Sequence, residues 1–509
     1  MTADPLGELA GRLGYALDPA QVAAMGEAVA AAEPHAAALR GIPVRPEHAD
    51  PALGEAWLAP EGAPGSGGGE AAGSIGRATA ERLREAWAGR AAESADRLEA
   101  LHERLNCTIR VLRGRASRPG LLEGVPFAVK DVIDVAGVPT TAASLTRRDA
   151  PPATESATVV ARLEEHGAVP ISKDATTEFA VGGPNPPLTG PTRNPWDPSR
   201  WAGGSSTGTA AAVAAGIVPF GLGTDVGGSV RLPAAWCGLT GLKPTAGAVP
   251  RTGVVPLSWT TETVGPLARD AETVALVFDL IRGPDGRDPR CRDRPPLELP
   301  DVRGLRIAVP GGYLTELCDA AVRAGVAQLV EALVDAGATV VPGEIPSAER
   351  ALPIGYQVVF TEAAALHRVD AGRWSEYDPV TVRRISQGIT TSASDYLRAL
   401  QFRVELQREL SAVFAGADLV VVPTTPATAP RLPDCTVTVD GQEYPLYAAQ
   451  SRATMLGNLT GAPGLAVPTG LAPDGLPVSA LLIAPPHREG TALSAARHFQ
   501  TVTDHHTDD

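Results

Sequence analysis

Residues 201–233 read WAGGSSTGTAAAVAAGIVPFGLGTDVGGSVRLP, a stretch far richer in glycine, serine and threonine than its neighbours. Two serine-glycine loops flank an alanine-rich segment, which predicts a helix over 207–215 and a short strand after it. The first loop places Ser205 at the start of this helix, where unpaired N–H groups and the helix dipole favour negative charge. The second loop, residues 223–229, has two adjacent glycines that let several N–H groups turn toward one point. An oxyanion hole requires this geometry, and the loop ends on Ser229.

A serine hydroxyl is a weak nucleophile, so the chain must also supply a base. Across residues 121–245 the only histidine is His166, in a charged helical stretch, and a Ser-His-Asp triad is not expected. Lys130 is the better candidate, because it is the one amine in the apolar run 126–133, which predicts a strand. Keeping a lysine neutral at pH 7 costs on the order of 4.6 kcal/mol, which burial can impose. Strand alternation directs the neighbouring Asp131 to the other face.

The lysine content of the chain supports this assignment. Only three lysines, Lys130, Lys173 and Lys243, occur beside more than forty arginines. A lysine can be neutral at pH 7 whereas an arginine cannot, so a lysine retained against this bias is a candidate for chemistry. A structural role is the ordinary expectation for Lys173 and Lys243.

Other interpretations of the same residues stay open at this stage. A GGSS loop standing alone is more often a tight turn, and residues 204–208 also match the G-x-S-x-G pattern, which would make Ser206 a nucleophile without a local histidine or acid. Asp225 and Arg231 are expected to form an ion pair that braces the second loop. The five cysteines have no metal-binding or redox spacing, so we expect them to be small core residues and expect no metal site.

The 509 residues are expected to divide into four parts. Residues 1–56 predict a small helical unit, 57–76 a glycine/serine-rich linker, 77–500 the catalytic domain and 501–509 a disordered tail. The catalytic domain is expected to begin with one long amphipathic helix and then to alternate between helices and short apolar runs. The predicted strands are 126–133, 217–222, 305–309, 419–422 and 464–468. This alternation predicts an α/β fold, one large sheet covered by helices.

The composition excludes several classes of partner. The chain has 44% apolar and 20% charged residues, as a globular protein does, and a formal net charge of -14. No cluster of lysine or arginine could neutralise a run of phosphates, so neither nucleic acid nor an anionic membrane is an expected partner. The longest small-apolar stretch, 210–223, is too short to span a bilayer, and the first 30 residues lack a signal-peptide pattern. With an odd number of scattered cysteines, we expect a cytoplasmic protein.

Three segments together resemble the amidase signature family. They are GVPFAVKDVIDVAGVPTT around Lys130, NPWDPSRWAGGSSTGTAAAVAAG around Ser205 and GLGTDVGGSVRLPAAWCGLTGLKPTAG around Ser229. The separation of the two serines equals that of the family's relay serine and nucleophile, and weaker likeness extends over about residues 80–495. The resemblance implies a single α/β/α domain built on a large mixed twisted sheet with helices on both faces, preceded here by a small N-terminal helical extension.

The resemblance also implies a Ser-Ser-Lys triad that hydrolyses an amide C–N bond. Neutral Lys130 would draw a proton through Ser205 while Ser229 attacks the amide carbon. The resemblance implies no metal or organic cofactor. It does imply a homodimer and a cis peptide bond at Ser205. The oxyanion would be held by four backbone N–H groups, those of Val226, Gly227, Gly228 and Ser229.

The substrate is a small-molecule amide that the sequence does not specify. The residues expected beside it are Thr141, Gly182, Gly183 and Trp236. Two other functions are compatible with the motifs: a glutaminase subunit of a tRNA-dependent amidotransferase, and a natural-product enzyme that transfers the acyl group to an amine. The chain departs from the commoner family pattern at Thr207, Thr209 and Ser479-Ala480. Its first 56 residues are faintly similar to small helical adaptors that accompany some amidases in s-triazine breakdown, and an inert helical cap is an equal alternative.

Overall fold

The computed structural model describes residues 22–23, 26–27, 30, 70–293 and 295–507. The expected helical unit 1–56 and residues 57–69 of the expected linker therefore lie, apart from five residues, outside the described part of the chain. The rest of that linker is structured: residues 70–76 form a two-residue strand and the first residues of a helix.

A single large sheet of eleven strands runs through the described chain. Its parallel pairs are β10/β9, β9/β11, β5/β3 and β3/β4, and its other pairs are antiparallel, so the predicted mixed sheet is confirmed. Its strands in spatial order are β10 (Thr339–Val341), β9 (Arg306–Ala308), β11 (Leu419–Pro423), β15 (Pro477–Ile483), β14 (Gly464–Leu471), β6 (Thr240–Lys243), β7 (Thr263–Ala268), β5 (Phe220–Asp225), β3 (Pro126–Lys130), β4 (Val169–Asp174) and β2 (Thr108–Val111). Two short ribbons pair β1 (Glu70–Ala71) with β8 (Glu298–Leu299) and β12 (Val437–Val439) with β13 (Gln442–Tyr444).

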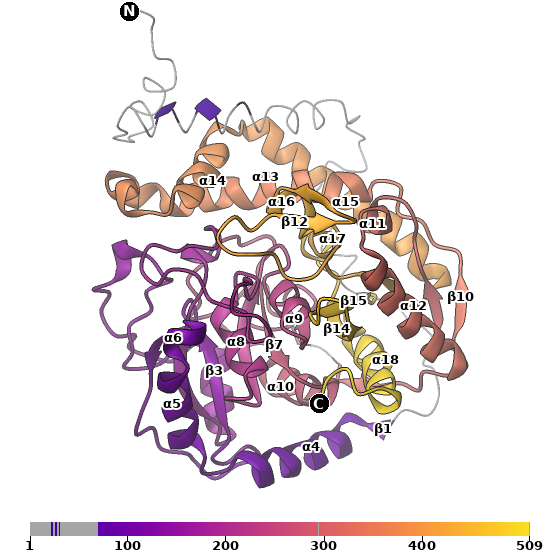
Figure 1. Ribbon diagram of the computed structural model, residues 1–509, viewed down its shortest axis with the longest axis horizontal. Coiled ribbons are helices and arrows are strands. Elements are labelled where there is room, and N and C mark those ends of the chain that lie inside the picture. The colour runs from indigo at the N-terminus through magenta and orange to yellow at the C-terminus, as the bar shows by residue number, and fades with distance from the viewer. Residues whose placement is uncertain (1–21, 24–25, 28–29, 31–69, 294, 508–509) are drawn as a thin grey trace, which may run out of the picture.

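Helices cover both faces of the sheet (Figure 1). One face carries α10 (Ala271–Ile281), α12 (Ala320–Asp335), α18 (Glu489–Val502), α7 (Thr158–Glu165) and, packed on α10, α4 (Ala72–Trp87). The other face carries α5 (Ala91–Ala100), α8 (Thr207–Ala214), α9 (Arg231–Trp236) and α17 (Thr454–Thr460). Over α17 lie α13 (Ala348–His367) and α15 (Ala393–Gly416), with α14 (Pro379–Thr390) against α13. The short helices are α6 (His102–Leu105), α11 (Tyr313–Glu316) and α16 (Leu446–Ala449).

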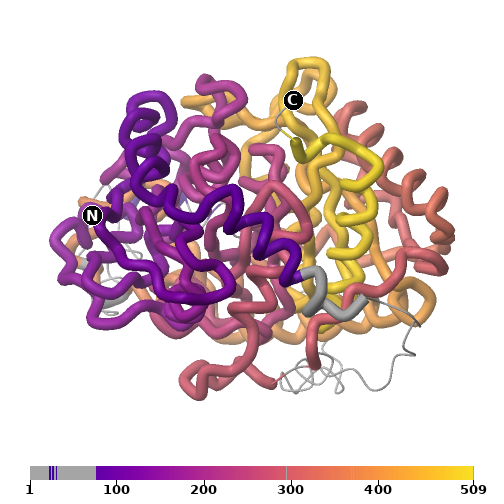
Figure 2. Tube along the Cα trace, turned by 90° about the horizontal axis from the view of Figure 1, so that it is seen from below, coloured from indigo at the N-terminus to yellow at the C-terminus, as the bar shows by residue number. Residues whose placement is uncertain are grey.

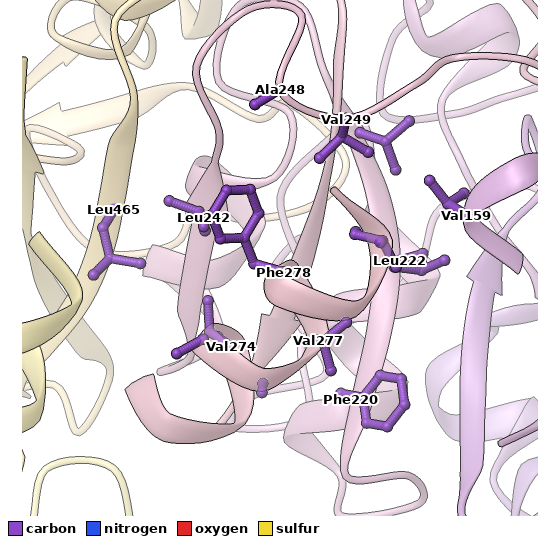
Figure 3. Packing of buried hydrophobic residues seen from close by; sticks show 14 of the residues in the cluster. Val159, Phe220, Leu222, Leu242, Ala248, Val249, Val274, Val277, Phe278 and Leu465 are labelled. Atoms are coloured by element: carbon purple, nitrogen blue, oxygen red, sulfur yellow. The ribbon is translucent and has the colours of Figure 1, made fainter. Parts of the chain in front are cut away.

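The central strands are apolar along their whole length because both of their faces are covered. In β11, Leu419 and Val421 join the core on the side of α10 and α12, whereas Val420 and Val422 join the core under α13 and α15. The first of these cores is shown in Figure 3, where side chains of α10 pack against those of β5 and β6. Figure 2 shows the molecule from below, with α4 in indigo crossing the outer surface.

Several expected elements have different bounds in the structure. The strand expected over 126–133 ends at Lys130, as β3, and those expected over 305–309 and 464–468 are Arg306–Ala308 and Gly464–Leu471. The long helix expected from Leu83 to Leu105 is three helices, and the first break follows from Gly89, which adopts a left-handed φ of 79° just after α4 ends. The strand expected over 217–222 begins and ends three residues later, as β5. The expected tail also differs: residues 501–502 complete α18, and the ring of His505 packs against Phe499 with 5.8 Å between ring centroids.

Strand order brings the loops of interest to one edge of the sheet. Neighbouring parallel strands β3 and β5 end at that edge with Lys130 and Asp225, and the antiparallel strand β7 begins there with Thr263 opposite Asp225. Ligands of α/β sheets bind beyond the carboxyl ends of parallel strands, so this edge is where a site is expected.

Candidate active site

Lys130 is the last residue of β3, and its side chain is completely buried. Its Nζ donates hydrogen bonds to Ser205 Oγ at 2.7 Å and to Thr224 Oγ1 at 2.8 Å, and it lies 3.3 Å from the Thr224 carbonyl oxygen. The expected lysine–serine contact therefore forms across 75 residues of sequence. Sequence reasoning missed Thr224, because placing it required the true end of β5.

The electrostatic setting favours the neutral form of this lysine. Burial lowers the pKa of Lys130 to about 7, against smaller opposing effects of the Glu262 and Asp225 carboxylates. All three hydrogen-bond acceptors of Nζ are uncharged oxygens, and no carboxylate of the described chain forms an ion pair with it. A sizeable fraction of Lys130 can therefore accept a proton near neutral pH, as a general base must.

The loop before α8 fits its place only with glycines. A Cβ on Gly203, whose φ is 86°, would lie 2.8 Å from the Trp236 ring, and a Cβ on Gly204 would lie 2.7 Å from the Trp201 ring. The peptide bond between Gly204 and Ser205 is cis, as the resemblance implies. Ser205 at the end of this loop contacts Lys130, and α8 begins two residues later at Thr207.

The nucleophile loop is organised around one buried carboxylate. Asp225 accepts hydrogen bonds from the N–H groups of Gly228 at 2.8 Å and Val230 at 3.0 Å, and from Asn458 Nδ2 at 2.8 Å. Arg231 donates to both of its oxygens, at 3.0 and 2.9 Å, which confirms the expected ion pair. Burial alone would raise the pKa of Asp225, but Arg231 holds it well below its usual range. The loop is thus anchored by a permanent charge.

This anchoring changes the expected oxyanion hole. The Gly228 N–H is already donated to Asp225, whereas the N–H groups of Val226, Gly227 and Ser229 have no acceptor within the described residues. We therefore count three available donors where four were expected. The fourth serves the anchor instead, because the turn with Gly228 at φ 127° points its N–H back toward β5.

A cavity opens above these loops. Ser205, Ser229 and Gly227 lie on its wall, and Ser229 is half-buried. The two loops are also tied to each other, because the Ser206 N–H donates to the Ser229 carbonyl oxygen at 3.1 Å. The remaining wall is largely apolar and comes from α9, α13, α14, α16, α17 and the loops: Thr177, Ala180, Val181, Gly182, Trp201, Gly204, Val226, Leu232, Leu257, Tyr356, Val359, Phe360, Arg384, Tyr447, Gln450, Ser451 and Met455.

Arg384 of α14 is the only charged side chain among the described residues on this wall. Its guanidinium carbon lies 3.4 Å from the ring centroid of Tyr447 and 5.5 Å from that of Phe360. It donates to the carbonyl oxygens of Val181 and Gly182, but it forms no ion pair with any described carboxylate. A cation that is only 7% exposed and lacks a counter-charge is costly unless a ligand supplies one.

Comparison with known proteins decides the family. A model of the family described as Amidase matches residues 88–493. The chain belongs to the amidase signature family. It is 38% identical over 400 residues to AtzE, the 1-carboxybiuret hydrolase subunit of Pseudomonas sp. (strain ADP), covering 77% of this chain and 86% of that one.

Two further likenesses place this amidase among its relatives. It is 39% identical over 432 residues to a glutamyl-tRNA(Gln) amidotransferase subunit of Chloroflexus aggregans, covering 78% of this chain and 85% of that protein. It also matches a solved structure described as a vestigial protein complex that reveals the evolutionary origins of an s-triazine catabolic enzyme. The TM-score is 0.76 at 33% identity, and the match covers 85% of this chain and 98% of that one. The amidase is a hydrolase of amide C–N bonds that acts on a small-molecule amide.

Only one of the four residues expected beside the substrate lies on the cavity wall of the amidase, and that is Gly182. The Gly183 N–H donates to Asp378 at 2.5 Å, and Trp236 packs behind Gly203. Thr141 donates its N–H to Asp131 at 2.9 Å, on the far side of β3. No sequence signal pointed to Arg384, because α14 reaches the site only through the packing of distant helices.

The remaining candidates of the amidase have structural positions. Ser206 is fully buried, and its hydroxyl donates to the Thr224 carbonyl oxygen at 3.3 Å. Lys173 forms a buried ion pair with Asp131 at 3.0 Å, on the face opposite Lys130, as strand alternation predicted. Lys243 donates to the Pro244 carbonyl oxygen at 2.9 Å, and burial, with the nearby Arg231, lowers its pKa to about 7. All five cysteines are buried and free, as expected.

No helix in the described ranges has the length and apolar character needed to cross a membrane.

Proposed function

We propose that this amidase cleaves its substrate through an acyl-enzyme on Ser229, with Ser205 as relay and Lys130 as base. The observation that carries the proposal is the 2.7 Å hydrogen bond between Lys130 Nζ and Ser205 Oγ, at a fully buried lysine whose serine partner opens onto the cavity. A neutral amine bonded to a hydroxyl at that distance can take its proton directly.

The proposed reaction balances without any other group. Ser229 Oγ bonds to the amide carbon while its proton moves to Ser205 Oγ and the Ser205 proton moves to Lys130 Nζ. The N–H groups of Val226, Gly227 and Ser229 are the donors available to the oxyanion. The C–N bond then breaks as the proton returns through Ser205 to the departing nitrogen. Water next bonds to the acyl carbon and gives its proton through Ser205 to Lys130, and the ester bond breaks as Ser229 Oγ takes a proton back, which releases the acid.

We further propose that the substrate carries a carboxylate or similar anion that binds Arg384. The support is a nearly buried guanidinium that stacks on Tyr447, faces the cavity and has no described counter-charge. The relative named as a 1-carboxybiuret hydrolase has a carboxylated compound in its name, which fits this class. The apolar surroundings strengthen the interaction, because a charge pair gains more in a medium of low dielectric constant.

A panel of small amides tests both parts of the proposal. Matched pairs of amides, with and without a carboxylate, would be assayed for release of ammonia or amine by the wild type, Ser229→Ala, Arg384→Met and Arg383→Met. Arg383 is an exposed neighbour on the same helix and serves as the control.

We expect Ser229→Ala to abolish release from every amide. We expect Arg384→Met to raise KM by about tenfold to a hundredfold for the carboxylated partner only, a range set by the loss of one buried charge pair. Equal effects on both partners, or an equal effect of Arg383→Met, would contradict the anion-binding role.

A second function is a glutaminase component of an amidotransferase, which the 39% identity to such a protein favours. It predicts that amide release depends on partner proteins. Activity of the purified chain alone at the same rate with and without cell extract would exclude it. Product analysis with added amines in the same assay distinguishes hydrolysis from acyl transfer, because only transfer yields a new amide.

We also propose a cytoplasmic homodimer. The family resemblance supports the dimer, and five free cysteines are compatible with a reducing compartment. Light scattering of the purified chain tests the dimer; a mass of one chain would contradict it.

A further inference from the structure

Glu262 is a buried carboxyl group that takes no part in the reaction proposed above. It precedes β7, whose first residue Thr263 lies opposite Asp225 at the edge of the sheet where Lys130 ends β3. Its side chain is 3% exposed. One carboxyl oxygen accepts a long hydrogen bond of 3.3 Å from the Leu257 N–H, and the other has no partner among the described residues. Such a group is costly to bury unless a charge nearby repays it.

Two cations act on Glu262, and Arg251 acts more strongly than Lys130. Arg251 faces it, but both of its bridging contacts go to Asp288, at 2.8 and 3.0 Å. Glu362 also faces it, with the same sign of charge, and is occupied by the hydroxyl groups of Ser258 and Tyr396. Lys130 has the opposite sign and no ion-pair partner of its own within the described chain.

The view from Lys130 gives the same pairing. Two carboxylates act on it, Glu262 and Asp225. Asp225 is already neutralised by the two contacts from Arg231, so it contributes little net charge. Asp174 lies opposite Lys130 in the strand register but turns its carboxyl group to Thr209 at 3.1 Å. Glu262 is therefore the uncompensated negative charge when Lys130 is protonated.

We propose that Glu262 is a positioning residue for the proton, the counter-charge that governs how readily Lys130 takes up and releases its proton during amide cleavage. The inference rests on the proposed role of Lys130 as base. Two states of the pair carry no net charge: neutral Lys130 with protonated Glu262, and ammonium Lys130 with ionised Glu262. Burial raises the pKa of Glu262 to about 7, so both states are within reach near neutral pH.

The test is the pH dependence of kcat/KM in Glu262→Gln. The base must be neutral, so activity falls as the pH drops through the pKa of Lys130. Removing the negative charge of Glu262 weakens proton binding at Lys130, and the acid limb of the profile should move to lower pH by on the order of one unit. Glu262→Asp keeps the charge, and its limb should lie between those of the wild type and Glu262→Gln.

Glu489→Gln is the matched control. Glu489 is also 3% exposed and faces the other buried lysine with a lowered pKa, Lys243, which lies outside the cavity wall. Its acid limb should coincide with that of the wild type. A limb of Glu262→Gln that moves to higher pH would overturn the proposal, and so would a limb that stays in place while the Lys130 amine itself titrates as in the wild type, since a purely structural role lowers the rate without moving the limb.

A second measurement reads Lys130 without catalysis. Because the chain has only three lysines, labelling lysine with ¹³C at Cε yields three NMR signals that can be followed through a pH titration and assigned with lysine variants. If the Lys130 signal titrates at lower pH in Glu262→Gln while the rate profile is unmoved, Glu262 acts as proposed and Lys130 is not the base. If the Lys130 signal of Glu262→Gln titrates as in the wild type, the proposal about Glu262 is wrong. If Glu262→Gln does not fold, Glu262→Asp takes its place, and a Lys130 signal that titrates there as in the wild type counts against the proposal in the same way.

Discussion

Replacing Lys130 by methionine should abolish amide cleavage and yet stabilise the protein. In the folded chain this lysine is fully buried with a pKa of about 7, whereas an unfolded lysine has a pKa of about 10.4. At pH 7 this difference lowers the free energy of unfolding by about 4 kcal/mol. Methionine has a similar shape and no charge, and Glu262, whose pKa burial raises to about 7, can remain protonated beside it. The variant loses the hydrogen bonds to Ser205 and Thr224, together worth about 2 kcal/mol. The expected net gain is about 2 kcal/mol at pH 7.

The pH dependence gives this prediction its sign. Between pH 7 and about 10.4 the unfolded chain binds a proton at residue 130 that the folded chain lacks, so this residue's cost to the wild type shrinks as the pH rises. The methionine variant has no such group, so its advantage should fall by about 1.4 kcal/mol per pH unit and vanish near pH 9, an order-of-magnitude figure.

Guanidinium unfolding of both proteins at pH 7, 8 and 9, followed by tryptophan fluorescence, measures this difference. Lys173→Met is the matched control, because it removes one member of the buried ion pair with Asp131. It should destabilise the protein by about 3–5 kcal/mol. A Lys130→Met protein that is less stable than the wild type at pH 7, or whose advantage does not change with pH, would refute the reasoning that the base is held neutral by burial.

Two further predictions follow from the same site. The kcat/KM of the wild type should rise with pH through about 7, as Lys130 loses its proton, and a rate that is level from pH 5.5 to 8.5 in a buffer series would count against a lysine base. Asp225→Asn should lower the free energy of unfolding by about 3–5 kcal/mol, because the fully buried Arg231 loses its counter-charge. It should also lower kcat, because the Gly228 N–H loses its anchor. Denaturant unfolding and steady-state kinetics measure the two effects, and an unchanged unfolding midpoint would contradict the first.

The parts of the site that could be predicted from the sequence are those with a local signal. Adjacent glycines beside a serine mark a loop that approaches other groups closely, and the steric space at Gly203 and Gly204 explains why no other residue serves there. A single amine in an apolar strand marked Lys130, and its bond to Ser205 was implied by the family resemblance. One large sheet covered by helices was also predictable, since helices and apolar strands alternate along the chain, whereas the mixed strand directions were implied by the family resemblance.

The parts that could not be predicted depend on contacts between distant segments. Arg384 reaches the cavity because α14 packs on α13, which no local pattern indicates. Thr224 contacts Lys130 only because β5 extends to Asp225, beyond the end expected from its apolar run. The Gly228 N–H turns to Asp225 rather than to the cavity because a buried carboxylate needs every donor within reach. Thr141 and Trp236 were close to the motifs in sequence but pack behind them.

Mass spectrometry of the acyl-enzyme tests the central claim most directly. The wild type, Ser205→Ala, Ser206→Ala and Ser229→Ala would be mixed with an activated ester of a carboxylated acid, quenched in acid and digested. We predict that the acyl group is found on Ser229 in the wild type and in Ser206→Ala, accumulates more slowly in Ser205→Ala, and is absent from Ser229→Ala. An acyl group on Ser205 or Ser206, or turnover by Ser229→Ala at the wild-type rate, would contradict the account.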